Sequence, residues 1–191
     1  MQVVKPEVRA AILESAKEEF VRKGFSDASV RTITANARTS AGNFYNYYSS
    51  KEDLFLELVL PVTDECIDMV RKNFDIASDK LQTVAYYIAD YIARNRDIFR
   101  ILTGGPAEHY SAFINRFVAC ISDILKEQIF KYAPEAAAKI RNPSFFDVVA
   151  TAYVGGLRPI IENFSDIDTM AEYISELMNF LFGDFTQRLM V

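Results

Sequence analysis

The feature that most restricts the fold of this chain is the stretch from Thr32 to Leu54, where short helical patterns follow one another with only tight turns between them. Ser29 is a natural N-cap for a helix over 30–36, because a serine hydroxyl accepts a hydrogen bond from the free backbone N–H groups at a helix start. Ser40 is placed in the same way before a third helix over 41–47. Two short helices joined by a tight turn, with small polar residues leading the second, predict a helix-turn-helix.

The rest of the chain is typical of an all-α protein. Half of the residues are hydrophobic, and alternating Val/Ile/Thr runs bounded by turns are absent. We predict a first helix over 6–23. A long helix follows, capped by Ser50 with Asp53 completing a capping box, and it runs to about Phe74 with a bend at Pro61. Further helices are expected over 78–95, 96–103, 107–132, 144–163 and 168–189.

This pattern predicts a helix-turn-helix domain over residues 1–52 and a larger helical domain over 53–191, with the boundary inside the long helix. The charges divide in the same way. Residues 1–51 carry eight Lys and Arg against five Asp and Glu, a net charge of +3, whereas the remainder carries −8. A basic head on an acidic body favours DNA contact through the head alone.

Cys66 and Cys120 lie in apolar helical patterns and are expected to be reduced core residues, since the N-terminus does not read as a secretory segment. No apolar run approaches the roughly 18 residues that a membrane span needs. We therefore expect a cytoplasmic protein without membrane contact and without a cofactor.

Lys51 is the clearest indication of a DNA contact in the head. A lysine in the first helical turn is unfavourable beside the helix dipole, so it points to a nearby phosphate, which the free N–H groups there also attract. The alternative is a solvated surface lysine, and the position of Lys51 directly after the aromatic cluster favours the phosphate contact. Tyr45 and Tyr47 supply rigid hydroxyl donors for phosphate oxygens. Phe44 and Tyr48 are expected to lie in the core beneath the third helix.

A set of spacings over about the first quarter of the chain is specific: Arg9, Ile12-Leu13, Ala16, Phe20, Gly24-Phe25, Ser29-Val30, Ile33, Ala37, Ser40, Gly42, Tyr45, Tyr47, Ser50-Lys51-Glu52 and Leu54. With these residues the head resembles the N-terminal domain of tetracycline-repressor (TetR) family regulators. The resemblance implies a homodimeric, ligand-responsive transcriptional repressor that binds a pseudo-palindromic operator in double-stranded DNA. It also implies that the larger domain holds the effector pocket and the dimer interface.

The resemblance implies DNA contacts by Ser29, Ser40, Ala41, Gly42, Asn43, Tyr45, Tyr47 and Lys51, and Arg38 and Thr39 complete the set of candidate DNA-binding residues. Arg38 stands where the family commonly has a turn glycine, and a left-handed conformation there costs roughly 1 kcal/mol. Ala41 stands where a longer, often basic side chain is frequent, which removes a base contact. Asn43 suits a bidentate pair with adenine, and Arg38 and Thr39 are the alternative readers of sequence.

Aromatic residues in the larger domain are expected as ordinary core or as the lining of an apolar pocket. If a pocket exists, Arg158, His109 and Asn115 are its candidate polar anchors, and the effector is a small, mainly apolar or aromatic molecule. The candidate ligand-binding residues are Tyr87, Tyr91, His109, Phe113, Phe117 and Arg158.

The last two expected helices carry apolar residues on more than one face, so a monomer would expose a large apolar patch. Gly155 and Gly156 either break a helix together with Pro159 or allow close helix approach at a dimer interface, and we favour the second interpretation. The candidate interface residues are Phe146, Tyr153, Gly155, Gly156, Leu177 and Leu181.

The sequence contains no catalytic constellation. His109 is the only histidine, which excludes histidine-rich metal sites and a catalytic triad. A site built from Cys66, His109 and Cys120 lacks ligand-like spacing, so no metal is predicted. We therefore predict a DNA-binding regulator and not an enzyme; the alternative is an α-helical small-molecule carrier without a transcriptional role.

Overall fold

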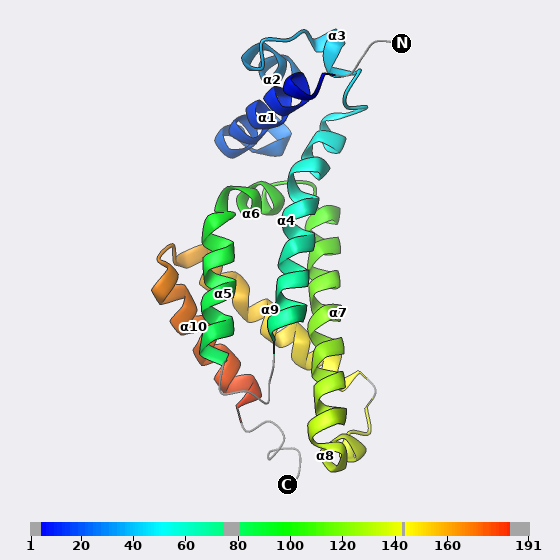
Figure 1. Ribbon diagram of the computed structural model, residues 1–191, viewed down its shortest axis with the longest axis vertical. Helices are drawn as coiled ribbons and strands as arrows, with labels where there is room; N and C mark the ends of the chain where they lie inside the picture. Colours follow the sequence, from blue (N-terminus) through cyan, green and yellow to red (C-terminus); the bar gives the residue numbers. More distant parts are fainter. Residues whose placement is uncertain (1–4, 75–80, 143, 184–191) are drawn as a thin grey trace. The chain divides into compact units, whose positions relative to one another are not determined.

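The computed structural model describes residues 5–74, 81–142 and 144–183 (Figure 1). These residues form helices and no strand, which confirms the all-α fold class. None of the described helices is long and apolar enough to span a bilayer. The helices are α1 (Pro6–Asp27), α2 (Val30–Asn36), α3 (Ala41–Phe44), α4 (Lys51–Asn73), α5 (Leu81–Arg94), α6 (Arg96–Thr103), α7 (Ala107–Tyr132), α8 (Pro134–Lys139), α9 (Phe145–Asn163) and α10 (Ile167–Phe182).

The chain divides into two compact units. Unit 1 comprises Met1–Asp64 and Asn95–Ser111, and unit 2 comprises Glu65–Arg94 and Ala112–Val191. The chain passes from unit 1 to unit 2 inside α4, so the division falls within the long helix. Unit 1 extends beyond the predicted domain 1–52, because α6 packs against α1 and the first turn of α7 follows it.

The local signals at the start of unit 1 act as their chemistry predicts. The helical path of α1 is interrupted at Gly24, whose φ of 77° suits a residue without a Cβ, and this agrees with the predicted end near residue 23. The hydroxyl of Ser29 accepts a hydrogen bond from the backbone N–H of Thr32 at 3.1 Å, so α2 has its predicted cap and its predicted limits.

The third helix is shorter than predicted. Ser40 caps α3 by accepting a hydrogen bond from the backbone N–H of Asn43 at 3.1 Å, but the helix ends at Phe44 and not at Tyr47. Beyond Phe44 the backbone bonds span three residues: Asn46 donates to the Asn43 carbonyl, and Tyr47 to the Phe44 carbonyl. This tighter winding is common where a short helix ends.

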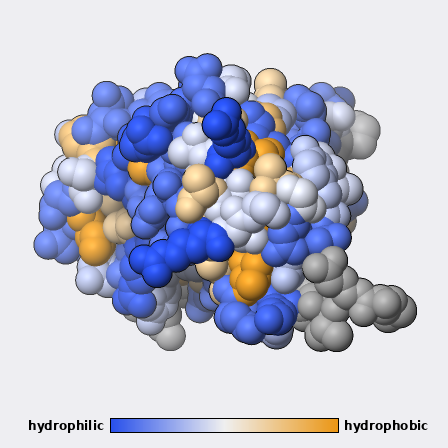
Figure 2. All heavy atoms as spheres, turned by 90° about the horizontal axis from the view of Figure 1, so that it is seen from above, coloured by the Kyte–Doolittle hydropathy of each residue, from blue (hydrophilic) through white to orange (hydrophobic). Residues whose placement is uncertain are grey.

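Aromatic rings form the centre of unit 1. Phe20 and Phe55 are fully buried, and the half-buried Phe25 lies against both, with ring centroids 5.6 and 5.2 Å away. Phe44 and Tyr48 are buried beneath α3 with centroids 5.5 Å apart, as predicted. Hydrophilic side chains dominate the face drawn in Figure 2, where hydrophobic ones form small separate groups.

The start of α4 is capped from both sides. Ser50 accepts a hydrogen bond from the Asp53 backbone N–H at 3.0 Å, and the Asp53 carboxylate accepts from the backbone N–H of Ser49 at 3.1 Å. The reciprocal partner is thus Ser49, one residue before the cap in the predicted capping box. The helix continues through the exposed Pro61 and ends at Asn73.

In unit 2, α10 packs against α5 and α9, and an aromatic cluster fills its interior. The rings of Phe74, Tyr153 and Phe182 meet edge to face with centroids 5.3–6.0 Å apart. Cys66 and Cys120 are free and buried, as predicted. Burial raises the pKa of the Cys66 thiol to about 12, which keeps it protonated at neutral pH.

The predicted limits of α6 and α7 are confirmed, and α9 starts directly after Ser144. Asp166 caps α10 by accepting a hydrogen bond from the Thr169 backbone N–H at 2.8 Å. The helix ends at Phe182, before its predicted end. The predicted helix start at Ser78 and Asp79, and the predicted helical positions of Phe185 and Leu189, lie outside the described residues.

The two adjacent glycines of α9 do not break it, so the helix-break interpretation is wrong. The helix runs through Gly155, Gly156 and Pro159 to Asn163. A Cβ added to Gly156 would lie 2.8 Å from Cδ2 of Leu177, whereas one added to Gly155 would meet nothing within 4 Å. Close helix approach therefore explains Gly156, but the approaching helix is α10 of the same chain.

This difference predicts opposite effects for two alanine substitutions. Gly155→Ala should stabilise unit 2 by up to about 1 kcal/mol, since alanine is the better helix former. Gly156→Ala should leave the protein about 1–2 kcal/mol less stable than Gly155→Ala, because the new methyl overlaps Leu177. Urea unfolding midpoints measure both. Adding Leu177→Ala should cost less in the Gly156→Ala background than in wild type; equal midpoints for the two single variants would contradict the packing argument.

Candidate DNA-binding site

The turn between α2 and α3 has the geometry of a helix-turn-helix. Arg38 adopts φ 53°, the left-handed conformation expected where the family has glycine, and it is the one non-glycine residue with positive φ among the described residues. The backbone N–H of Thr39 donates to the Thr34 carbonyl at 2.9 Å, which closes the end of α2. This strained segment redirects the chain from α2 into α3 within a few residues.

The predicted DNA-contacting residues all retain solvent exposure. Six are exposed and four are half-buried, so none is lost to the core of unit 1. Tyr45 is 63% exposed and rests edge to face on Phe44, with centroids 5.2 Å apart. The exposed set is Ser29, Arg38, Ser40, Ala41, Gly42 and Tyr45, and the half-buried set is Thr39, Asn43, Tyr47 and Lys51.

Asn43 is held by side chains of its own segment. Its Nδ2 donates to Oγ1 of Thr39 at 2.8 Å, and its Oδ1 accepts from Nδ2 of Asn46 at 2.9 Å. An amide carries two donor protons and two acceptor lone pairs, so each end keeps one further bonding position. These contacts orient the amide along α3 without using up its capacity to bond a base.

The hydroxyl of Tyr47 accepts a hydrogen bond from the backbone N–H of Lys5 at 3.1 Å. That contact ties the chain just before α1 to the end of the α3 segment. The Tyr47 hydroxyl still has its own proton to donate, which is the role predicted for it towards phosphate.

Lys51 has partners that the sequence did not reveal. Its ammonium donates to the carbonyl oxygens of Phe25, Ser26 and Ala28 at 2.6, 3.3 and 2.9 Å, and it lies 4.5 Å from the centroid of the Phe25 ring. An ammonium has three protons, so all three are engaged within unit 1. A phosphate contact by Lys51 stays a prediction, and it would require the exchange of at least one of these bonds.

A second contact with α4, from Arg9 of α1, was not predicted from the sequence. Arg9 donates from Nη2 to Oε2 of Glu57 at 2.6 Å, and its guanidinium carbon lies 5.9 Å from the centroid of the buried Tyr48 ring. Burial raises the pKa of the Tyr48 hydroxyl, which therefore stays neutral. Glu57 is 48 positions from Arg9, and no local pattern indicates such a pair.

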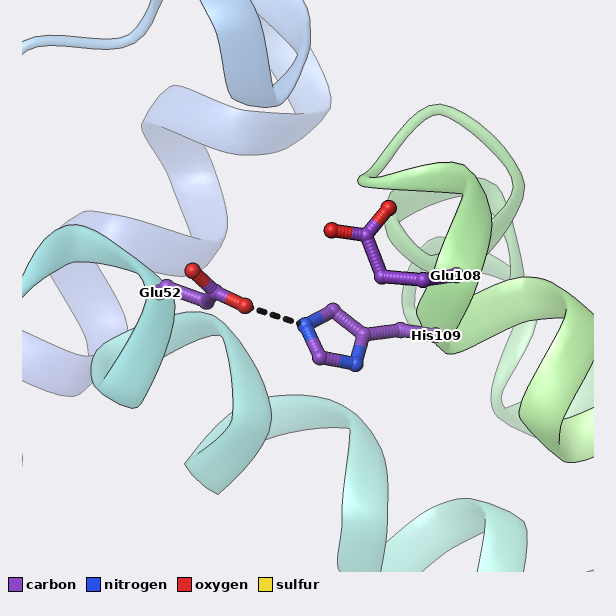
Figure 3. A group of neighbouring side chains, drawn as sticks. All are labelled: Glu52, Glu108 and His109. Atoms are coloured by element: carbon purple, nitrogen blue, oxygen red, sulfur yellow. Dashed lines mark hydrogen bonds and ion pairs between the residues drawn. The ribbon is translucent and has the colours of Figure 1, made fainter.

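His109 lies in unit 1, beside the start of α4. Its Nε2 is 2.6 Å from Oε1 of Glu52, and its ring centroid lies 5.6 Å from that of Phe55 (Figure 3). This predicted ligand anchor is therefore bound to a residue next to Lys51.

The other ligand candidates lie in unit 2. Phe113 and Phe117 are buried and stacked at 5.8 Å, and Tyr91 donates to Glu65 at 3.0 Å. Burial and this hydrogen bond raise the pKa of Tyr91. Tyr87 is 48% exposed, and Arg158 is exposed and paired with Glu162 at 2.7 Å. Two of the predicted anchors, His109 and Arg158, thus each contact a different glutamate, Glu52 in unit 1 and Glu162 in unit 2.

The dimer candidates separate into core and surface. Phe146 and Tyr153 are buried within unit 2, and their side chains contribute to its core and not to an exposed face. Gly155 is exposed, and Gly156, Leu177 and Leu181 are half-buried. Val148, Tyr173 and Phe180 on the same two helices are exposed but are not among the candidate interface residues; Phe180 is 76% exposed.

Comparison with known proteins agrees with this geometry. The profile described as "Bacterial regulatory proteins, tetR family" matches residues 12–58. The uncharacterized HTH-type transcriptional regulator YdgC of Bacillus subtilis is 23% identical over 188 residues, which cover 92% of this chain and 91% of that protein. The HTH-type transcriptional repressor AcnR of Corynebacterium diphtheriae is 28% identical over 112 residues, 58% of this chain and 55% of that protein.

The fold is also found among solved structures. A transcriptional regulator from Aquifex aeolicus aligns with a TM-score of 0.68 and 18% identity, over 92% of this chain and 99% of that one.

The contacts of Lys51 predict a structural role that can be measured without DNA. Lys51→Ala should destabilise the protein by about 1–3 kcal/mol, since hydrogen bonds to a charged donor are lost and three carbonyls lose their partner. Lys72→Ala, an exposed lysine of the same helix, should change stability by less than about 0.5 kcal/mol. Urea unfolding followed by circular dichroism gives both values. If the two variants were equally stable, the carbonyl contacts would have no energetic weight.

Proposed function

We propose that this chain, which belongs to the TetR family of transcriptional regulators, is a repressor that binds a pseudo-palindromic operator as a homodimer. A mainly apolar small molecule releases it from the operator. Regulators of this family bind DNA and are not enzymes. The observation that carries this proposal is the helix-turn-helix of α2 and α3, which lies inside the matched segment 12–58 with its turn and leading residues exposed. The name of AcnR, a repressor, supports the direction of control.

In this proposal α3 enters the major groove. Its first residues, Ala41 and Gly42, are exposed and carry almost no side chain, so the backbone of α3 can approach the bases closely. Arg38 and Asn43 then read sequence, since guanidinium and amide groups pair bidentately with guanine and adenine edges. Ser29, Tyr45 and Tyr47 contact phosphates and fix the register.

The proposed dimer uses the outer faces of α9 and α10. Val148 on α9 and Tyr173 and Phe180 on α10 are large apolar side chains that are 64%, 43% and 76% exposed. Gly155 is exposed on α9 with no atom within 4 Å of an added Cβ, which leaves room for a partner helix. A two-fold dimer presents two recognition helices to successive major grooves, about 34–36 Å apart or somewhat more.

Effector release in this proposal works through α4, because this one helix runs from unit 1 into unit 2. An effector in unit 2, against apolar rings such as Phe113 and Phe117, biases the position of the two DNA-binding heads. By linkage, the factor by which effector weakens DNA binding equals the factor by which DNA weakens effector binding.

Arg38 provides the sharpest test of DNA binding. Arg38→Gly removes the guanidinium and also relieves the left-handed strain, so it separates DNA contact from stability. Affinity for duplex DNA from upstream of the protein's own gene should fall about 5- to 150-fold, with relaxed specificity. Fluorescence anisotropy across salt concentrations measures this.

Arg100→Ala, an exposed arginine of α6 in the same unit, is the charge-matched control and should change affinity less than about twofold. Unchanged binding by Arg38→Gly would remove Arg38 from the interface. Absence of salt-dependent DNA binding by the wild type would favour the alternative function, a small-molecule carrier.

The dimer face is tested with a pair of exposed phenylalanines in unit 2. Phe180→Glu places a charge in the proposed interface and should shift the micromolar protein from dimer to monomer in sedimentation velocity, since an unpaired buried charge is costly. Phe130, which is 56% exposed on α7, serves as the control, and Phe130→Glu should remain dimeric. A monomeric wild type at these concentrations would refute the dimer.

A further inference from the structure

We propose that Glu52, Glu108 and His109 form a binding site for a divalent transition-metal cation with the ligand preferences of Zn²⁺. The site joins the first turn of α4 to the first turn of α7, and all three residues belong to unit 1 (Figure 3). This differs from the expectation of no metal site, which rested on the single histidine and on the spacing of Cys66, His109 and Cys120 and did not consider glutamates. The inference stands apart from the proposed function, since it concerns metal binding by the protein alone.

The ligand atoms already lie close together. One carboxylate oxygen of each glutamate and one imidazole nitrogen are all within 4.8 Å of one another, and Nε2 of His109 is 2.6 Å from Oε1 of Glu52. Bond lengths of about 2.0–2.2 Å to Zn²⁺ place neighbouring ligands about 3–3.5 Å apart. Small side-chain rotations are therefore enough, and Glu108, which is exposed, has the freedom to make them.

The imidazole is held in place by the core of unit 1. Its ring lies against Phe55, which is fully buried and in turn contacts Phe25. Gly105, in the turn between α6 and α7, approaches the Phe55 ring so closely that an added Cβ would overlap it. The start of α7 is thus fixed against this aromatic ring, and a ligand nitrogen set by rigid packing loses little entropy on binding a metal.

The helix dipole alone does not explain the cluster. Glutamates in the first turns of α4 and α7 are expected at helix N-termini, where negative charge is favourable. A histidine there is not, since its protonated form is disfavoured beside the same dipole. Within the described part of the chain Glu108 makes no ion pair or hydrogen bond, so its charge is available to a cation.

The donor set fixes the class of metal. An imidazole nitrogen favours Zn²⁺ and neighbouring transition metals, whereas Mg²⁺ prefers oxygen ligands only. Three protein ligands leave one tetrahedral position for water, and the two carboxylates balance the charge of the cation. The metal would replace the Glu52–His109 contact by a stronger link between the residue after Lys51 and the start of α7.

Isothermal titration of Zn²⁺ into the chelator-treated full-length protein tests the site. Wild type should bind one Zn²⁺ per chain. His109→Phe keeps a ring against Phe55 but removes the nitrogen, and Glu108→Gln keeps shape but removes charge, so each should weaken Zn²⁺ binding by at least about tenfold. Glu7→Gln, at an exposed glutamate in the first turn of α1, should leave Zn²⁺ affinity within about twofold of wild type.

Two further measurements distinguish Zn²⁺ binding at this site from metal binding by the cysteines and from a Glu52–His109 contact without metal. Co²⁺ should give d–d absorption without a thiolate charge-transfer band, and Mg²⁺ should not compete with Zn²⁺. Stoichiometric Zn²⁺ binding that survives His109→Phe, or a thiolate band with Co²⁺, would overturn the proposal. So would a wild-type protein without saturable binding below millimolar Zn²⁺, which would leave Glu52 and His109 as a hydrogen-bonded pair only.

Discussion

The DNA-binding unit depends on one cation and three carbonyl oxygens. α1 ends at Asp27, so the carbonyls of Phe25 and Ser26 in its last turn, and that of Ala28 after it, have no helical partners, and the Lys51 ammonium binds all three. This single side chain fixes the connection between α1 and α2 to the first turn of α4. Ser29, which caps α2, directly follows the Ala28 carbonyl that Lys51 binds, so the start of α2 is tied to the same contact.

Local chemistry in this chain could be predicted from sequence, and long-range pairing could not. Ser29, Ser40 and Ser50 each cap the helix that follows, because capping involves only residues two or three positions away. The contact of His109 with Glu52 spans 57 positions. The helical pattern places Glu52 and His109 each in the first turn of a helix. It does not indicate that these two helix starts lie side by side.

The same limit explains why only some of the candidate interface residues on α9 and α10 lie on an exposed face. A helix with apolar residues on two faces can pack one face against the core of its own chain and the other against a second subunit. The periodicity of the sequence does not show which face does which. Tyr153 looked like an interface residue and is fully buried, whereas Phe180 and Val148 are the exposed ones. Gly156 was correctly linked to close helix approach, but its neighbour Leu177 belongs to the same chain. Only the three-dimensional packing distinguishes an intramolecular neighbour from a second subunit.

The division of the chain inside α4 has a consequence for how such regulators can be recombined. Unit 1 is assembled from two separate stretches of sequence, Met1–Asp64 and Asn95–Ser111, so its gene segment is not continuous. A chimera that joins residues 1–52 to a foreign effector domain would leave α1 without α6, and Phe20 and Phe25 without the Phe55 ring that packs against them. Exchanging DNA specificity between relatives is therefore easier by changing single residues in the turn and α3 than by grafting the head.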